Sequence, residues 1–309
     1  MSAAPQHGPG AARAGAPAQH PAEPSRRQAF GARLARAMEE HGPLCVGIDP
    51  HEGLLRAWGL PDTAAGLRDF ALRTVEAVGG RVAAVKPQSA FFERHGSAGI
   101  AVLEEVLAAL AQCATLSVLD VKRGDIGSTM AGYAQAYLDR DAPLAADAIT
   151  ASPYLGYGSL APALDLAAQA RRGVFVLALT SNPEGAGLQH ARDRDGRAVA
   201  RAVVEGVAAS NAAARRAGEL GSIGLVVGAT VGEAVAELGI DLEAAGGPVL
   251  APGVGAQGAG ARELEQVFGP ARRQVLASTS RAVLGAGPGI GKLRAAALEA
   301  SHQAARALR

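Results

Sequence analysis

The sequence has little lysine, little cysteine and no long hydrophobic run. Of its 309 residues, 30 are basic and 29 are acidic, yet only three of the basic residues are lysines. The near balance of charge argues against a strongly basic nucleic-acid-binding arm, and the 49% hydrophobic content argues against a disordered chain. We therefore expect a folded protein that does not bind nucleic acid.

The other two shortages bear on where the protein works. Two cysteines, Cys45 and Cys113, are too few for a disulfide framework and fit a reducing cytoplasm. No apolar run approaches the roughly 18 to 20 residues of a membrane-spanning helix, and the N-terminus lacks the apolar stretch of a signal peptide. The sequence predicts a soluble, cytoplasmic protein without membrane contact. Its seven histidines include no pair at a helical metal-binding spacing, so no histidine-built metal site is expected.

The three lysines are Lys86, Lys122 and Lys292, and the other 27 basic residues are arginines. Arginine is a planar, permanently charged fork, whereas lysine is a compact ammonium whose pKa can shift and which can pass on its proton. A lysine kept in so arginine-rich a chain is a candidate for a position where arginine cannot serve. Chance and codon bias are the alternative, and position along the chain decides between them.

The chain divides into a short tail and one large region. Residues 1–25 are rich in Ala, Gly and Pro without hydrophobic periodicity and predict a disordered tail, which leaves 26–309 as the folded domain. An amphipathic helix is expected from Arg26 to the Gly42-Pro43 stop. Further helices are expected over 63–80, 99–113, 200–218 and 232–239. Between the helices lie eight apolar runs, at 44–49, 82–87, 115–122, 146–152, 174–180, 223–230, 248–253 and 274–280.

These runs predict the fold. They are continuously hydrophobic, which is typical of parallel strands buried on both faces. Eight strand and helix units in about 280 residues match a single-domain (β/α)8 TIM barrel in count and in length. A doubly wound open sheet is the alternative.

In such a barrel the chemistry lies at the C-terminal ends of the strands. Polar residues stand at these ends in this sequence: Asp49 after the first run, Lys86 after the second, Asp120 and Lys122 after the third, and Ser152 after the fourth. Two of the three lysines are thus expected at the barrel mouth, whereas Lys292 falls in the last helix as a surface charge.

The segment LDVKRGDIGST, residues 119–129, carries the strongest signal. Asp120 and Lys122 are two apart on one strand and are expected to point to the same face. Asp125 would begin the next helix, where a carboxylate suits the helix dipole. A buried ion pair with a helix-capping aspartate would explain these three residues alone. Lys86 and Asp49 on neighbouring strands favour function instead, because burying an alternating set of charges costs several kcal/mol per ion.

A second pattern follows the seventh run. Gly253, Gly255 and Gly258 satisfy G-x-G-x-x-G, the fingerprint of dinucleotide-binding folds, but the acidic residue expected about 20 positions later is missing. Glycines at a helix start together with Arg281 after the eighth run instead predict a phosphate site. Gln257 would add a side-chain donor. A tight turn without a ligand is the simpler alternative.

These motifs resemble orotidine 5′-phosphate decarboxylase, and more narrowly its longer bacterial subgroup. The resemblance rests on VGIDPH (46–51), VKPQSAFFERHG (85–96), LDVKRGDIGST (119–129), ITASPYLG (149–156), LTSNPEG (179–185), VVGAT (226–230), PGVGAQG (252–258) and STSRAVL (278–284). It implies the last step of UMP biosynthesis, the decarboxylation of orotidine 5′-monophosphate without a metal or an organic cofactor. It also implies a homodimer with shared active sites.

The resemblance also implies a role for each matching residue. Lys122 would protonate C6 of the pyrimidine, with Asp120 beside the departing carboxylate and Lys86 and the partner subunit's Asp125 completing the charged array. Asp49 and Lys86 would hold the ribose. The remaining expected substrate contacts are Ile126 and Thr129 from the partner, Ser152 at the pyrimidine, and Gln257, Gly258 and Arg281 at the phosphate.

Two rival functions fit the same barrel. A magnesium-dependent enzyme acting on a keto-sugar phosphate would keep the D-x-K-x-x-D pattern but needs an acidic ligand where Lys86-Pro87-Gln88 stands, and Glu93 lies too far along. A catalytically silent nucleotide-binding barrel would be expected to have lost at least one of the charged residues.

Overall fold

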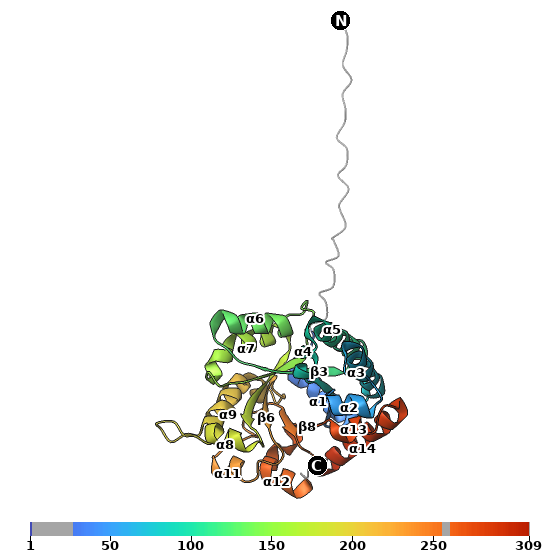
Figure 1. Ribbon diagram of the computed structural model, residues 1–309. Helices are drawn as coiled ribbons and strands as arrows, with labels where there is room; N and C mark the ends of the chain where they lie inside the picture. Colours follow the sequence, from blue (N-terminus) through green and yellow to red (C-terminus); the bar gives the residue numbers. More distant parts are fainter. Residues whose placement is uncertain (2–26, 255–259, 309) are drawn as a thin grey trace.

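Eight parallel strands close into a barrel in the computed structural model, which describes residues 1, 27–254 and 260–308 (Figure 1). Each strand pairs with the next along the chain, and β8 closes the ring on β1. The strands are β1 (Leu44–Ile48), β2 (Ala84–Pro87), β3 (Leu116–Arg123), β4 (Ala148–Ala151), β5 (Gly173–Leu179), β6 (Ile223–Val227), β7 (Val249–Pro252) and β8 (Val275–Thr279). Each falls on one predicted run, so the predicted TIM barrel is confirmed and the open sheet is wrong. The predicted tail, apart from Met1, lies outside the described residues.

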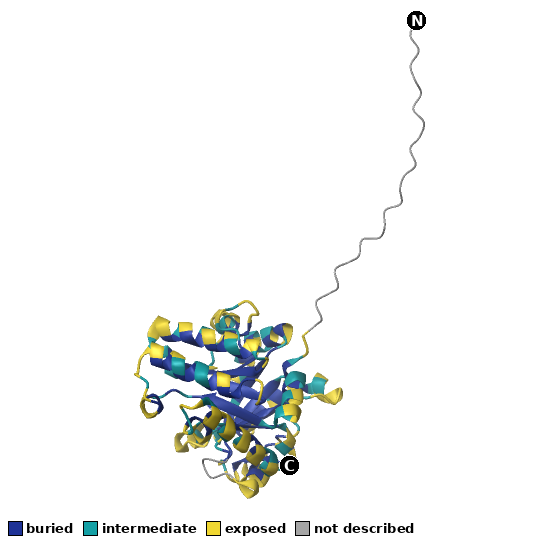
Figure 2. Ribbon diagram, turned by 90° about the vertical axis from the view of Figure 1, so that its right-hand side faces the viewer, coloured by how far each residue is buried: buried dark blue, intermediate teal, exposed yellow. Residues whose placement is uncertain are grey.

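Helices surround the barrel, with their buried faces toward the strands and their exposed faces outward (Figure 2). None of the helices that the structure describes has the length and apolar character needed to cross a membrane. The helices are α1 (Phe30–His41), α2 (Glu52–Ala57), α3 (Ala64–Val78), α4 (Ser89–Glu93), α5 (Gly96–Gln112), α6 (Gly127–Leu138), η1 (Tyr157–Leu160), α7 (Ala161–Ala170), α8 (Pro183–Gln189), α9 (Val199–Ser210), α10 (Ala212–Arg216), α11 (Ala234–Glu237), α12 (Ala261–Phe268), η2 (Gly269–Gln274), α13 (Arg281–Leu284) and α14 (Ile290–Leu308).

One helix prediction was wrong in an informative way. Residues 200–218 read as one helix, but the structure breaks them into α9 and α10 at Asn211. The side chain of Asn211 is buried, donates to the carbonyls of Ile223 and Ala245, and accepts from the amide of Ile223. These hydrogen bonds attach the helix pair to the start of β6, and a residue that bonds to distant backbone in this way favours a helix end over a helix interior.

The interior of the barrel is apolar at one end and charged at the other. Along β3 the residues that point inward are Leu116, Val118 and then Asp120, while Leu119 packs outward against the helices. The same alternation leads along β2 from Ala84 to Lys86. Because strand side chains alternate with a period of two, parallel strands bring their last inward residues together at the C-terminal face.

Helix α1 covers the opposite, N-terminal end of the barrel. Phe30 and Leu34 are fully buried there, and the Phe30 ring meets Phe175 edge to face with centroids 5.9 Å apart. The helix is held by Asp147, a buried carboxylate that accepts a hydrogen bond from Arg33 at 2.7 Å and also pairs with Arg27. The closed lower end leaves the C-terminal face as the open end of the barrel.

Candidate active site

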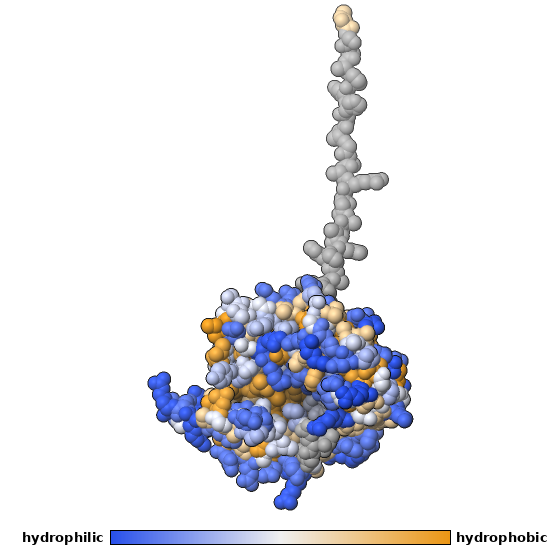
Figure 3. All heavy atoms as spheres, in the orientation of Figure 1, coloured by the Kyte–Doolittle hydropathy of each residue, from blue (hydrophilic) through white to orange (hydrophobic). Residues whose placement is uncertain are grey.

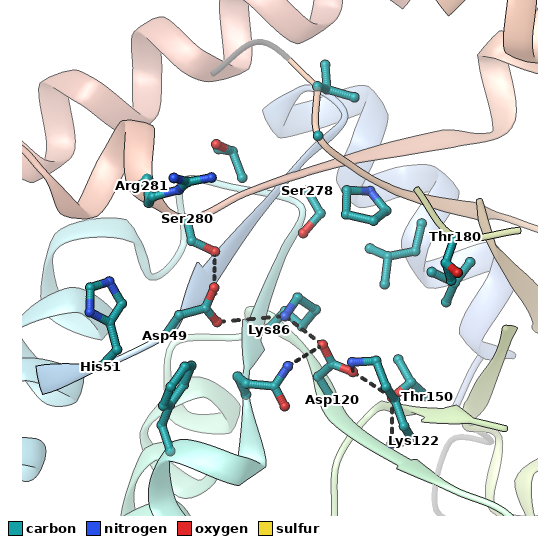
Figure 4. A pocket seen from close by; sticks show the side chains of 18 of the residues that line it. Asp49, His51, Lys86, Asp120, Lys122, Thr150, Thr180, Ser278, Ser280 and Arg281 are labelled. Carbon is teal, nitrogen blue, oxygen red and sulfur yellow. Dashed lines mark hydrogen bonds and ion pairs between the residues drawn. The ribbon is translucent and has the colours of Figure 1, made fainter. Parts of the chain in front are cut away.

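A cavity of about 520 Å³ opens at the C-terminal ends of the strands. Figure 3 shows the hollow near the middle of this face, with hydrophobic atoms inside it and hydrophilic atoms around it. Five charged residues from four strand ends line the cavity, and Figure 4 shows their side chains converging on it. They are Asp49, Lys86, Asp120, Lys122 and Arg281.

Asp120 is the centre of the charged group. Its Oδ2 accepts hydrogen bonds from Lys86 Nζ at 2.8 Å and from Gln88 Nε2 at 2.9 Å. Its Oδ1 accepts from Lys122 Nζ at 2.6 Å and from Thr150 Oγ1 at 2.8 Å. Asp120 is only 6% exposed, and four donors on its two oxygens satisfy the buried carboxylate and hold it in one orientation.

Burial and charge act in opposite directions on this group. Burial alone would raise the pKa of Asp120, but the ammonium groups of Lys86 and Lys122 outweigh it and lower the pKa. Burial would likewise lower the pKa of Lys86, and the carboxylates of Asp120 and Asp49 outweigh it and raise the pKa. Asp120 is therefore an anion and Lys86 a cation at neutral pH.

Lys122 differs from Lys86 in its surroundings. The Lys86 side chain is 9% exposed and lies between two carboxylates, whereas the Lys122 side chain is 46% exposed and, among the described residues, pairs with Asp120 alone. The Lys122 ammonium thus faces the open part of the cavity, where it could reach a bound molecule.

Asp49 connects this group to the end of β8. Its Oδ2 accepts a hydrogen bond from Ser280 Oγ, and its Oδ1 lies 3.8 Å from Lys86 Nζ. Oδ1 is buried and has no hydrogen-bond partner among the described residues. Such an atom is an acceptor in position for a hydroxyl group that enters the cavity.

The expected phosphate end of the site is described only in part. Arg281 opens α13 and lines the cavity close to Ser280. Gly253, on the neighbouring strand end, has φ of +95°, a backbone conformation that favours glycine. Gln257 and Gly258, the other two predicted phosphate contacts, lie outside the described residues.

Four predicted site residues do not line the cavity of this chain: Asp125, Ile126, Thr129 and Ser152. The first three follow β3: Ile126, 61% exposed, and Thr129 are exposed to solvent, and Asp125 is half-buried. Asp125 was also expected to begin a helix, but α6 begins at Gly127 with Ile126 as its N-cap. The Asp125 carboxylate instead accepts a hydrogen bond from the amide of Ile126 at 2.8 Å, in the segment just before the helix.

Ser152 is half-buried beside the turn after β3. Its amide donates to the carbonyl of Arg123, and its own carbonyl approaches Gly124 so closely that a Cβ there would lie 2.2 Å from it. Ser152 therefore packs the β3 and β4 ends together. The residue of β4 that does reach the cavity is Thr150.

Polar cavity residues that the sequence reasoning did not single out include His51, Gln88 and Thr150, whereas Thr180 was expected only as the polar end of its strand. Gln88 and Thr150 bind Asp120, and Thr180 at the end of β5 exchanges two hydrogen bonds with Gln189 of α8. The signal for Thr150 was present, because it is a polar residue two positions from inward-facing Ala148 in an apolar run.

Within the described part of the chain, no group of three or more His, Cys, Asp or Glu side chains could hold a metal ion. The two carboxylates of the cavity are instead bridged by Lys86, whose ammonium lies between them. The chemistry that this arrangement favours is the placement of positive charge and of a transferable proton beside an anionic ligand.

Comparison with known proteins identifies the family. The profile of the orotidine 5′-phosphate decarboxylase / HUMPS family matches residues 42–296. An orotidine 5′-phosphate decarboxylase of Salinispora arenicola is 60% identical over 270 residues, which cover 87% of this chain and 95% of that protein. The chain belongs to the orotidine 5′-phosphate decarboxylase family. The decarboxylase of Streptomyces coelicolor is 56% identical over 269 residues, which cover 87% of this chain and 94% of that protein.

Solved structures of decarboxylases agree with this assignment. A Streptomyces avermitilis protein described as an orotidine 5′-phosphate decarboxylase superposes with a TM-score of 0.87 at 54% identity, covering 91% of this chain and 96% of its own. The decarboxylase of Leishmania donovani superposes with a TM-score of 0.71 at 32% identity, covering 91% and 99%. The predicted family is therefore confirmed, and neither the magnesium-dependent enzyme nor the silent barrel has support.

Proposed function

We propose that this chain decarboxylates orotidine 5′-monophosphate to UMP and CO2, with Lys122 supplying the proton that replaces the carboxyl group. The observation that carries the proposal is the placement of the Lys122 ammonium, which is held 2.6 Å from Asp120 and faces the open cavity. In the reaction the bond between C6 and the carboxyl carbon breaks, CO2 leaves, and its bonding electron pair stays on C6. The proton of Lys122 then forms the new C6–H bond, and the lysine regains a proton from solvent.

The charged group suits this reaction. No position of the pyrimidine ring can delocalise the electron pair left at C6, so a cation held nearby must stabilise it. A lysine can provide both the charge and the proton, whereas arginine keeps its proton. Asp120 lies beside the substrate carboxylate in this arrangement, and Lys86 keeps Asp120 ionised and in place.

The remaining predicted contacts bind the ribose and the phosphate, which are parts of the substrate remote from the reacting carbon. Asp49 Oδ1 accepts a hydrogen bond from a ribose hydroxyl. The ammonium of Lys86 donates a hydrogen bond to the ribose as well. Arg281 binds the phosphate at the other end of the cavity with Gln257 and Gly258. Binding energy from a phosphate so far from C6 can still lower the barrier, because it holds the reacting group beside Lys122.

The proposal includes a homodimer whose active sites are shared. Asp125, Ile126 and Thr129 act in the site of the partner subunit, which explains why they do not line the cavity of their own chain. Large apolar side chains are exposed on the adjoining loops: Ile126 is 61% exposed after β3, and Tyr154 and Leu155 are 73% and 51% exposed after β4. Exposed apolar groups on neighbouring loops are typical of a surface that a second protein covers.

The direct test of the function is to treat the purified protein with EDTA, add orotidine 5′-monophosphate, and follow the change in ultraviolet absorbance to UMP. We expect turnover without added metal. No turnover, or turnover that depends strictly on added Mg²⁺, would refute the proposal.

The shared site is tested by complementation. Subunits carrying Lys122→Ala are mixed with subunits carrying Asp125→Ala, each inactive alone. If Asp125 acts across the interface, exchange restores complete sites, up to about a quarter of all sites in a two-fold symmetric dimer after random mixing. A mixture no more active than either parent places Asp125 in its own subunit's site.

A further inference from the structure

Thr150 of β4 contacts both the carboxylate and the backbone of the proposed proton donor's strand. We propose that its hydroxyl positions Lys122 for proton transfer, an inference that rests on the proposed function of Lys122. Thr150 is 1% exposed, and its Oγ1 donates to Asp120 Oδ1 at 2.8 Å while accepting from the Lys122 amide at 2.9 Å. The single hydroxyl proton goes to the carboxylate, so one group joins Asp120 to the Lys122 backbone.

The backbone at Lys122 explains why such support is needed. Lys122 has φ of +46°, in the left-handed region that non-glycine residues rarely occupy. The pairing of β3 with β4 shifts its register between Leu119 and Arg123, around this residue. The Lys122 amide bonds to a side-chain oxygen of β4 there. A strained conformation of this kind persists only where its surroundings determine it.

The left-handed turn decides where the ammonium lies. It falls one residue before the end of β3, and the side chain lies over the cavity with Nζ 2.6 Å from Oδ1 of Asp120. Thr150 fixes both the backbone and the ammonium partner of Lys122. Its Oγ1 accepts from the Lys122 amide and donates to Asp120 Oδ1, the same oxygen that accepts from Lys122 Nζ. Without the hydroxyl, the Lys122 backbone and the Asp120 carboxylate each lose one fixed partner.

A flexible lysine makes this restraint useful. The Lys122 side chain is 46% exposed, has four rotatable bonds and is tied to one carboxylate. Proton transfer requires Nζ and C6 to stand about 3 to 3.5 Å apart in a favourable orientation, so a backbone held in one conformation raises the share of molecules ready to react. Thr150 is therefore a positioning residue: it acts through Lys122 and Asp120.

Shape alone could also account for a buried threonine at this site, and three substitutions separate the two explanations. Thr150→Val keeps the shape and removes the hydroxyl. Thr150→Ser keeps the hydroxyl and removes the methyl group. Thr150→Ala removes both, and it differs from the serine variant by a single oxygen atom.

The experiment measures kcat and KM for orotidine 5′-monophosphate, with the thermal midpoint of each variant. Because small displacements of a catalytic group can cost about 100-fold in rate, we expect the valine and alanine variants to lose about 10- to 100-fold in kcat. KM should stay near the wild-type value, since Asp49 and Arg281 are untouched. The serine variant should retain kcat within about threefold, because it keeps both hydrogen bonds.

The matched control is Thr74→Val. Thr74 is also fully buried, and its Oγ1 donates to the carbonyl of Phe70 in α3, away from the cavity. This variant should lower the thermal midpoint while leaving kcat unchanged. A crystal structure of Thr150→Val supplies a second readout, in which φ at Lys122 should leave the left-handed region.

Activity that follows shape, with valine active and serine and alanine impaired, would overturn the inference. So would a loss of kcat in Thr150→Val that Thr74→Val reproduces. If the valine variant does not fold, the serine and alanine pair decides alone, and equal kcat values for the two refute the role of the hydroxyl. An inactive wild-type protein would instead refute the proposed function, which separates the two failures.

Discussion

Replacing Lys122 by arginine separates the charge of this residue from its proton. The guanidinium keeps a positive charge beside Asp120, so the ion pair at 2.6 Å can be replaced by a similar one. The proton is what changes, because arginine holds it about two to three pKa units more tightly than lysine does. A positioned proton donor contributes about 10²- to 10⁴-fold in rate, and we expect Lys122→Arg to lose kcat by about that factor.

Substrate binding should survive the same change. The Lys122 side chain is 46% exposed, so there is room for the larger group, and the residues proposed to hold ribose and phosphate are untouched. We therefore expect the affinity for UMP, measured by calorimetry, to stay within about threefold of wild type, since uniform binding contacts are retained. The rate is followed from the ultraviolet change on conversion of orotidine 5′-monophosphate.

The chain supplies its own controls, because it has only three lysines. Lys292 is exposed on α14, and Lys292→Arg should leave kcat and stability unchanged. Lys86 is 7% exposed, and the larger arginine there should cost about 1–3 kcal/mol of folding free energy through overpacking. Turnover by Lys122→Arg within about tenfold of wild type would refute the assignment of Lys122 as general acid.

Three further predictions concern charges that the fold holds in place. Asp120→Asn leaves Lys86 buried without its nearest carboxylate and should cost about 3–5 kcal/mol in urea unfolding at neutral pH. Because folding lowers the pKa of Asp120, this stabilisation is present at pH values above the ordinary pKa of 3.8 and is lost as the pH falls further. The difference in unfolding free energy between the variant and wild type should therefore shrink in acid. A difference that does not change with pH would contradict the ion-pair origin. Arg281→Gln should raise KM about 10- to 100-fold by removing a charged phosphate donor, as steady-state kinetics would show, and an unchanged KM would place the phosphate elsewhere. Asp147→Asn leaves Arg33 without its carboxylate partner at the N-terminal end of the barrel and should lower the unfolding free energy by about 3–5 kcal/mol. The kcat of the folded enzyme should stay unchanged. Thermal unfolding and steady-state kinetics on the same variant check the two expectations.

The sequence predicted the barrel and the place of its charges because both follow from periodicity. The first three apolar runs carry charged residues at their ends, and parallel strands in a closed sheet bring those ends together, so Asp49, Lys86, Asp120 and Lys122 had to share one cavity once the fold was right. That part of the prediction needed no knowledge of side-chain contacts.

What the sequence did not reveal depends on geometry within a single residue step. Ser152 was the predicted contact at the end of β4 and Thr150 was not considered, because the bonds of Thr150 to Asp120 and to the Lys122 amide depend on the left-handed turn at Lys122 and the register shift beside it. The helix expected over 200–218 breaks at Asn211 for a similar reason, since its amide bonds to backbone far along the chain. The hydrogen bonds of Thr150 and Asn211 have no periodic signature, although the inward-facing position of Thr150 has one.

The two lysines of the cavity meet different requirements. Position 86 requires a compact cation that remains charged while buried. The carboxylates of Asp49 and Asp120 keep Lys86 charged by raising its pKa against the effect of burial. Such a group is a poor proton donor, because the same carboxylates that hold it stabilise its charged form. Among the described residues Lys122 pairs with one carboxylate, and its ammonium faces the open cavity, where a bound ligand would meet it. In the proposed reaction Lys86 supplies electrostatic support and Lys122 the proton, so substitution of each by arginine should fail for a different reason: lack of space at Lys86 and retention of the proton at Lys122.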